Sequence, residues 1–234
     1  MSENSHNDVE NRGNTPQKHE RDKLEDGVSP QTIEPSSPGD FGLVQVWWGN
    51  GKGKTTAAMG MGIRAVGHGY RVHMIQFMKG GTSTVEDVRG EYNAIEVLPG
   101  FSYENSGHYG WHGFLDGSDD GIHAAKARGG LRRAREVLDS SRDVEAGLPL
   151  DGSPADGVHM LILDEVLYAV SQGLLKEEDV VELVESKPDD LELVLTGSQE
   201  KPDYIYGKAD LVTHVDKEKH PIEKGQGARK GTEY

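Results

Sequence analysis

The spacing of apolar positions changes near residue 41, and this change divides the chain into two parts. Residues 1–40 contain nine acidic and four basic residues but only five apolar ones. A segment of this composition buries too little apolar surface to offset the entropy lost when the chain is ordered. We therefore predict a mobile, disordered acidic tail over residues 1–40, followed by one folded domain over residues 41–234.

Short apolar runs alternate with amphipathic stretches throughout the second part. The runs predict buried strands at residues 43–48, 71–77, 94–98, 158–163, 191–195 and 211–215. Helical spacing predicts helices at residues 55–66, 119–140, 165–172, 177–186 and 202–208, with Gly129-Gly130 interrupting the second of them. Strands that alternate with helices indicate a parallel sheet. The pattern predicts an α/β fold: a mostly parallel, six-stranded sheet with helices on both faces.

A glycine-rich segment separates the first strand from the first helix. It consists of Gly49, Asn50, Gly51, Lys52, Gly53, Lys54, Thr55 and Thr56. The glycines let backbone N–H groups turn towards a polyphosphate at the helix N-terminus, where Lys54 adds a positive charge and Thr55 can bind Mg²⁺. We predict that this loop grips the triphosphate of ATP in a P-loop NTPase-like fold. Trp48 stands where the strict G-x-x-x-x-G-K-[ST] pattern has its first glycine, so the loop is a variant.

The fourth predicted strand ends in two acidic residues, Asp164 and Glu165. A carboxylate at the end of an apolar strand lies opposite the phosphate loop, where it can bind Mg²⁺. The alternative is that Asp164 only caps the following helix, which leaves Glu165 for the metal. The candidate metal ligands are therefore Thr55, Asp164 and Glu165.

Three other segments carry side chains that a ligand could contact. Residues 76–80 end the second strand, where Lys79 faces either a substrate anion or only solvent, and residues 196–198 end the fifth strand in a similar position. Residues 100–114 form a predicted loop with five Phe, Tyr and Trp rings. Such a loop is typical of a lid over a flat ligand, with a small satellite core as the alternative.

Composition excludes several classes of function. The chain of 234 residues has no cysteine, which excludes disulfides, thiol catalysis and thiolate metal sites. Its net charge of -15 argues against general binding to nucleic acid or anionic membranes. No apolar run approaches the roughly 20 residues that span a bilayer, and the first residues lack a signal peptide. We expect a cytoplasmic protein; the charge fits both an ordinary acidic protein and one adapted to high salt.

The order of these motifs resembles the P-loop, CobA-type corrinoid adenosyltransferases from residue 43 to residue 234. The resembling segments are GNGKGKTTAA at 49–58, RAVGHG at 64–69, QFMKG at 76–80, GFSYEN at 100–105, LILDEVLYAV at 161–170, VLTG at 194–197, ADLVTHV at 209–215 and KGQGARKGTEY at 224–234. The variant phosphate loop is itself typical of that family.

The resemblance implies transfer of the 5′-deoxyadenosyl group of ATP to Co(I) of a corrinoid, with triphosphate as the leaving group. It implies that Thr55 and Glu165 bind Mg²⁺ and that Arg64 approaches the nucleotide. The phosphate-binding residues that it implies are Asn50, Gly51, Gly53, Lys54 and Thr56. Phe101 and Tyr103 match two aromatic residues that pack near the corrinoid and displace its lower axial ligand. An electron donor for the cobalt and a homodimer also follow from the resemblance.

This chain departs from the family pattern at three places. Tyr103 replaces a residue that is commonly Trp, Ser198 follows Thr-Gly where the family usually has Arg, and insertions occur around residues 109–118 and 143–157. Two other functions stay open from the residues alone: a phosphoryl-transfer kinase or ATPase, and a nucleotide-dependent switch module. A hydrolase needs a residue that positions water near the γ-phosphate, and the sequence offers no specific candidate. A switch has no need of the aromatic segment.

Overall fold

The computed structural model of the chain describes residues 30–78, 90–107, 120–142, 144 and 147–232. It divides the chain into two units, residues 1–32 and residues 33–234. Only residues 30–32 of the first unit are described, and they form neither helix nor strand. Residues 33–40 belong to the second unit, where the Ser36 amide donates to the carbonyl oxygen of Gly69 at 3.0 Å. The predicted mobility of residues 1–40 stays a prediction.

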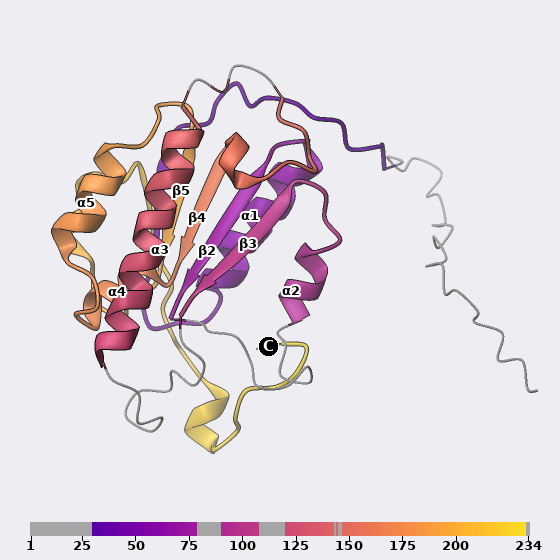
Figure 1. Cartoon of the computed structure of the whole chain (residues 1–234). Helices are drawn as coiled ribbons and strands as arrows, with labels where there is room; N and C mark the ends of the chain where they lie inside the picture. The colour runs from indigo at the N-terminus through magenta and orange to yellow at the C-terminus, as the bar shows by residue number, and fades with distance from the viewer. Residues whose placement is uncertain (1–29, 79–89, 108–119, 143, 145–146, 233–234) are drawn as a thin grey trace, which may run out of the picture. The chain divides into compact units, whose positions relative to one another are not determined.

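The second unit contains a six-stranded sheet in the order β3-β2-β4-β5-β1-β6, and every neighbouring pair is parallel. The strands are β1 (Val44–Trp48), β2 (Val72–Phe77), β3 (Phe101–Ser106), β4 (Met160–Asp164), β5 (Glu192–Thr196) and β6 (Leu211–His214). Figure 1 labels β2, β3, β4 and β5, whose arrows point towards one edge of the sheet. This sheet confirms the predicted six-stranded α/β fold.

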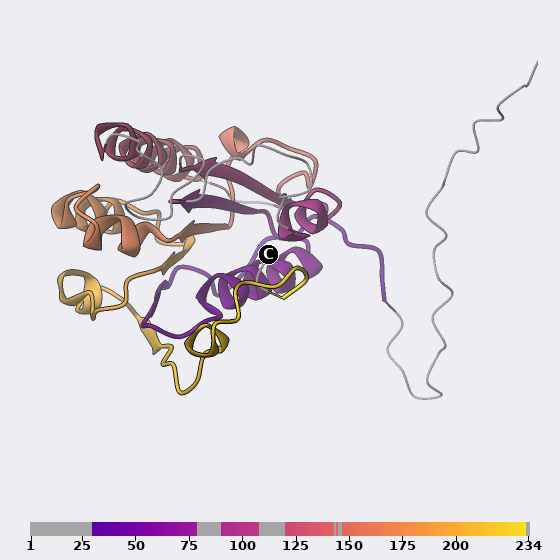
Figure 2. The ribbon, with the colours of Figure 1, turned by 90° about the horizontal axis from the view of Figure 1, so that it is seen from below.

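Helices cover both faces of the sheet because the strands are apolar on both sides. Helices α1 (Lys54–Gly67) and α2 (Gly90–Ile95) lie on one face, and the other face carries α3 (Asp120–Ser140), α4 (Val166–Ser171), α5 (Glu177–Glu185) and α6 (Asp203–Tyr206). Figure 2 shows these layers. Alternate strand residues serve the two faces: Met74 packs on the α1 side, whereas Ile75 and Phe77 pack on the α3 side. No described helix is long and apolar enough to cross a membrane.

The prediction of a third strand at residues 94–98 is wrong. Residues 90–95 form helix α2, and the third strand is β3, which lies within the segment predicted as an aromatic loop. Buried Tyr92 and Ile95 have the i, i+3 spacing of a helix. The apolar run at 94–98 masked this spacing. The rest of the predicted aromatic loop, from residue 108 to residue 114, lies outside the described residues.

Two predicted interruptions turn out to be packed parts of the fold. Gly130 lies inside α3, where a Cβ would stand 2.4 Å from Ser106 Oγ and 2.9 Å from a ring carbon of Phe77, so the glycine lets the helix approach the sheet. The described part of the insertion at 143–157 includes the 3₁₀ helix η2 (Pro154–Asp156). Its Leu150 carbonyl accepts from the Gly100 amide at 2.9 Å, which joins the insertion to the start of β3.

Candidate ATP and corrinoid site

The last two strands fix the shape of the phosphate loop. The Gly49 amide donates to the Ser198 carbonyl at 3.0 Å, and the Gly51 amide donates to the Val215 carbonyl at 2.8 Å. The Asn50 side-chain oxygen accepts from the Lys217 amide at 2.9 Å. A Cβ on Gly49 would lie 2.3 Å from the Val215 oxygen, so the loop tolerates only glycine at this close approach. The loop is therefore braced from the carboxyl ends of β5 and β6.

Helix α1 begins at the end of this loop. Its N-cap Gly53 has φ 111°, a backbone conformation that favours glycine, and no described side chain caps the helix. The Lys54 ammonium group donates to the carbonyl oxygens of Gly49 and Gly51 at 2.6 and 3.0 Å, so it lies over the loop. A helix N-terminus and a lysine thus lie at the same place, and both favour a bound anion.

The carboxylate of Asp164 faces the start of α1 from the end of β4. It is fully buried and accepts hydrogen bonds from the hydroxyls of Thr55 at 2.9 Å and Thr196 at 2.7 Å. A third donor is the Gln76 amide nitrogen at 3.1 Å. The N-cap of α4 is Glu165, at φ 62° and without a side-chain cap bond. The N-cap position of α4 therefore belongs to Glu165 and not to Asp164.

The donor set at this place fits Mg²⁺. Magnesium in nucleotide sites is held by one or two carboxylates or hydroxyls together with phosphate oxygens and water. Thr55 and Asp164 supply such oxygen atoms beside the loop, and the half-buried Glu165 follows Asp164 in the chain. The described residues hold no cluster of three or more His, Asp or Glu that could bind a metal without a substrate. In magnesium sites with few protein ligands, phosphate oxygens and water complete the coordination.

The two aromatic residues of β3 have different surroundings. The ring of Phe101 is 6% exposed and packs against α1 so closely that a Cβ on Gly62 would lie 2.7 Å from it. Tyr103 is half-buried, and its ring stacks on Tyr92 with the centroids 4.6 Å apart and the planes at 6°. Phe101 is therefore part of the core in this structure, whereas Tyr103 keeps an accessible surface.

Comparison with known proteins bears on what this site binds. Residues 40–234 match the family described as ATP:corrinoid adenosyltransferase BtuR/CobO/CobP. The chain belongs to this family. The corrinoid adenosyltransferase of Pseudomonas aeruginosa is 32% identical over 194 residues, which cover 82% of this chain and 84% of that protein. Corrinoid adenosyltransferase CobA of Salmonella typhimurium is 28% identical over 215 residues, which cover 91% and 94%.

One residue of the expected adenosyltransferase site stands apart from the phosphate loop. Arg64 is exposed in the last turn of α1, ten residues after Lys54 and therefore about 15 Å further along the helix axis. The structure does not bring it to the loop. Lys52 is exposed on the loop, Thr56 is exposed in the first turn of α1, and Lys79 lies outside the described residues.

Ser198 stands where most members of the adenosyltransferase family are expected to have Arg. It is buried at φ 57°, and its hydroxyl donates to the Glu200 carbonyl, whereas its own carbonyl accepts from the Gly49 amide. The contribution of this residue to the loop is therefore made by its backbone. Sequence reasoning missed the bracing role of Val215 and the Gln76 contact to Asp164, since both are contacts between separate elements, which the motifs at 76–80 and 209–215 do not predict.

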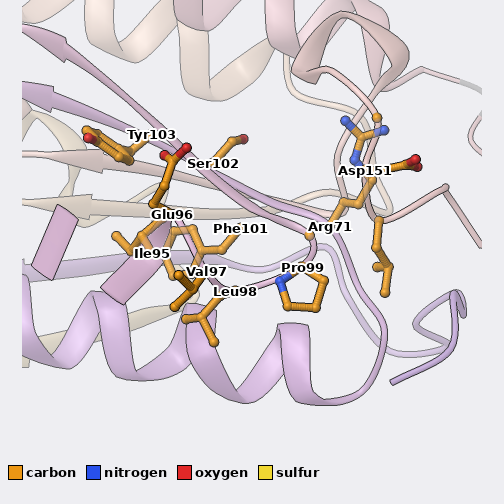
Figure 3. Close-up of a pocket in the computed structure, with 13 residues that line it drawn as sticks. Arg71, Ile95, Glu96, Val97, Leu98, Pro99, Phe101, Ser102, Tyr103 and Asp151 are labelled. Carbon is orange, nitrogen blue, oxygen red and sulfur yellow. The ribbon is translucent and has the colours of Figure 1, made fainter. Parts of the chain in front are cut away.

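A pocket of about 480 Å³ lies at the edge strand of this adenosyltransferase, towards the amino ends of β2 and β3. Figure 3 shows Tyr103 at one end of it and Arg71 with Asp151 at the other. Arg71 is 2% exposed, and Nη1 has no hydrogen-bond partner among the described residues. Burial lowers the pKa of Arg71, against the opposing effect of Asp156 and Asp151. The pocket lies at the opposite end of the strands from the phosphate loop.

Proposed function

We propose that this chain transfers the 5′-deoxyadenosyl group of ATP to the reduced cobalt of a corrinoid and releases triphosphate. The observation that carries the proposal is the convergence of Lys54, the phosphate loop and the Thr55–Asp164 pair at the carboxyl edge of the sheet, in a member of the adenosyltransferase family. ATP-dependent adenosylation of corrinoids is the activity of that family.

The reaction requires no protein nucleophile. The electron pair of Co(I) forms the bond to C5′ of the ribose, and the C5′–O bond breaks with its electron pair moving to the triphosphate. Negative charge therefore develops on the leaving group, where Lys54 and the loop amides lie. Groups that bind this charge more tightly in the transition state than in ATP accelerate the reaction.

Mg²⁺ would supply further positive charge to the same leaving group. We assign Thr55 and Glu165 as its ligands. Asp164 is a third candidate, and its hydrogen bond from Thr55 would also orient that hydroxyl towards the metal. Because Asp164 already accepts from Thr196 and Gln76, its position is fixed before the metal arrives.

The aromatic residues of β3 would serve the corrinoid. Tyr103, with its accessible ring, faces the corrinoid and helps to displace the lower axial ligand, which eases reduction of Co(II) to Co(I). Phe101 supports this face from beneath, packed against α1. We further propose an electron donor that reduces the cobalt, a homodimer and a cytoplasmic location.

The proposal is tested with purified protein, ATP, Mg²⁺ and chemically reduced cobalamin. We expect the absorption spectrum of adenosylcobalamin and one equivalent of intact triphosphate. Omitting Mg²⁺ or replacing ATP with ADP should slow the reaction. Release of ADP and phosphate without a change in the cobalamin spectrum would show a phosphoryl-transfer enzyme instead.

A further inference from the structure

Tyr92 connects the aromatic face of β3 to helix α2. It is 7% exposed and one of the two buried residues of that helix, which has only six residues. Its ring stacks on the ring of Tyr103. The two ring centroids are 4.6 Å apart, and the angle between the ring planes is 6°. A stacked pair of this kind moves together more easily than separately, because sliding one ring forfeits dispersion and electrostatic contacts with the other.

The hydroxyl of Tyr92 reaches into the sheet. It donates to Gln76 Oε1 at 2.6 Å and lies 3.1 Å from Asn105 Oδ1. Gln76 is fully buried, and its Nε2 donates to Asp164 Oδ2 at 3.1 Å. Asp164 in turn accepts from the Thr55 hydroxyl. One continuous chain of contacts therefore runs from the ring of Tyr103 to the first turn of α1.

The carboxylate of Asp164 only accepts and therefore takes the NH₂ end of the Gln76 amide, while the Tyr92 hydroxyl holds the oxygen end. A carboxamide carries a donor at one end and an acceptor at the other, so it can be turned either way unless a neighbour selects. The Tyr92 O–H can donate to the oxygen, which leaves the NH₂ group for the carboxylate. With the amide reversed, the Gln76 oxygen would face the oxygen of Asp164, and a buried carboxylate would lose a donor.

We propose that Tyr92 is a positioning residue that couples the corrinoid face at Tyr103 to the magnesium and triphosphate end of the site at Thr55. The coupling rests on the proposed function, since it joins the two substrates of that reaction. A corrinoid that binds against the Tyr103 ring changes the position of the Tyr92 ring stacked on it. The hydroxyl of Tyr92 holds the Gln76 amide, and that amide orients Asp164. Each substrate therefore changes the affinity for the other by the same factor.

The test measures binding without turnover. The Kd of Mg·ATP is measured by calorimetry on the full chain, with and without saturating aquacobalamin and with no reductant present. The ratio of the two constants should differ from one by about fivefold or more in the wild type, within the usual range of coupling between sites. Tyr92→Phe keeps the stacked ring but removes the hydroxyl, and its ratio should fall to within roughly twofold of one.

Two further variants test whether an effect of Tyr92→Phe comes from the chain of contacts: one breaks the chain at another link, and the other is a matched control. Gln76→Leu breaks the same chain at its next link and should abolish the coupling as Tyr92→Phe does, even if the latter variant fails to fold. Tyr70→Phe is the matched control: its ring contacts Phe41 and His159 at the other end of β2, and it should keep the wild-type ratio. A residue with a merely structural role would lower stability without changing the ratio.

The outcomes separate this inference from the proposed function. A wild-type ratio near one, or an unchanged ratio in both Tyr92→Phe and Gln76→Leu, would overturn the coupling. If the wild type forms adenosylcobalamin from reduced cobalamin in either case, the proposed function stands and only the role of Tyr92 fails. If the wild type forms none, the proposed function fails.

Discussion

The ammonium group of Lys54 donates to two carbonyl oxygens of its own loop. A bound phosphate would compete for the same protons, so Lys54 exchanges contacts with the loop for contacts with the leaving group. At the residue scale, the site therefore combines the positive charge of Lys54, which can change partners, with a loop held in place by the backbone hydrogen bonds of Gly49 and Gly51.

Lys54→Ala should nearly abolish turnover while the fold is kept. Loss of one donor to developing negative charge typically costs about 10²–10³ in rate, and we expect kcat for adenosylcobalamin formation to fall by at least this factor. Steady-state kinetics with chemically reduced cobalamin measure the effect. Lys208→Ala, which removes an exposed lysine paired with Glu185, is the control and should match the wild type.

Tyr103→Ala should harm the reaction that starts from Co(II) more than the one that starts from Co(I). The proposed role of the ring is to help remove the lower axial ligand before reduction, a step that is already complete in Co(I). Initial rates are compared from cob(II)alamin with a mild reductant and from cob(I)alamin prepared chemically. Equal losses from the two starting states would contradict the assigned role.

Gly62 and Gly60 lie on opposite sides of α1 and form a matched pair. A Cβ on Gly62 would stand 2.7 Å from the Phe101 ring, whereas a Cβ on Gly60 meets no atom within 4 Å. Alanine in place of glycine gains about 0.5–1 kcal/mol in a helix, but overpacking a core costs about 1–3 kcal/mol. Urea unfolding should show Gly60→Ala stabilised and Gly62→Ala destabilised by about 1 kcal/mol. Equal stabilisation of both would mean that Phe101 yields without cost.

At the scale of whole elements, the sequence predicted the strands that have apolar residues on both faces. β1, β2, β4 and β5 were found to within a residue or two, because a buried parallel strand is a continuous apolar run. The more exposed edge strand β6 was found from the short run at 211–215. β3 was missed because it is an edge strand whose alternation of Phe101, Tyr103 and polar residues looks like a loop.

The sequence predicted those residues of the candidate site that lie in recognisable motifs. The loop and Thr55 have a fixed spacing, and Asp164 follows an apolar run, so both could be located without a fold. Contacts between separate elements could not. The pairing of Tyr92 with Tyr103, and of Gln76 with Asp164, depends on strand order and on a helix that the apolar run at 94–98 concealed.

The edge strand β3 is tied to the sheet and to α3 by Glu104. Its carboxylate lies 3.4 Å from Nε2 of His73 and 3.0 Å from Nε of Arg133. The His73 contact forms no well-aligned hydrogen bond, so we regard it as an electrostatic contact. His73 first and then Arg133 lower the pKa of Glu104 from its ordinary value of 4.5 to about 2, against the opposing effect of burial.

Glu104→Gln should therefore lose stability in a pH-dependent way. A carboxylate whose pKa is lower in the folded than in the unfolded chain stabilises the fold above its unfolded pKa, and this contribution disappears as the pH falls. Urea unfolding of the wild type and Glu104→Gln should differ most above about pH 4.5 and converge towards about pH 2. Glu136→Gln removes the more exposed partner of Arg133 and should cost less. A difference that does not change with pH would contradict the assignment.

At the scale of the whole molecule, the net charge of -15 repels itself in the folded state. Salt shortens the Debye length from about 30 Å at 0.01 M to about 3 Å at 1 M, so KCl should raise Tm at neutral pH. Near the sequence pI of about 5.0 the net charge vanishes, and the same salt series should have little effect. Calorimetric scans at both pH values measure this. An equal rise at both would indicate a general salt effect on the protein surface instead.

Among the six strands of the described sheet, the strand that leads into the phosphate loop comes first in sequence, but its two neighbours in the sheet come last. The carbonyls of Ser198 and Val215, which brace the loop, are therefore made after more than three quarters of the polypeptide. A nascent chain on the ribosome carries the loop sequence for most of its synthesis without the partners that shape it. The growing enzyme should acquire affinity for ATP only when β6 emerges, so cellular ATP stabilises finished molecules and not partly made ones.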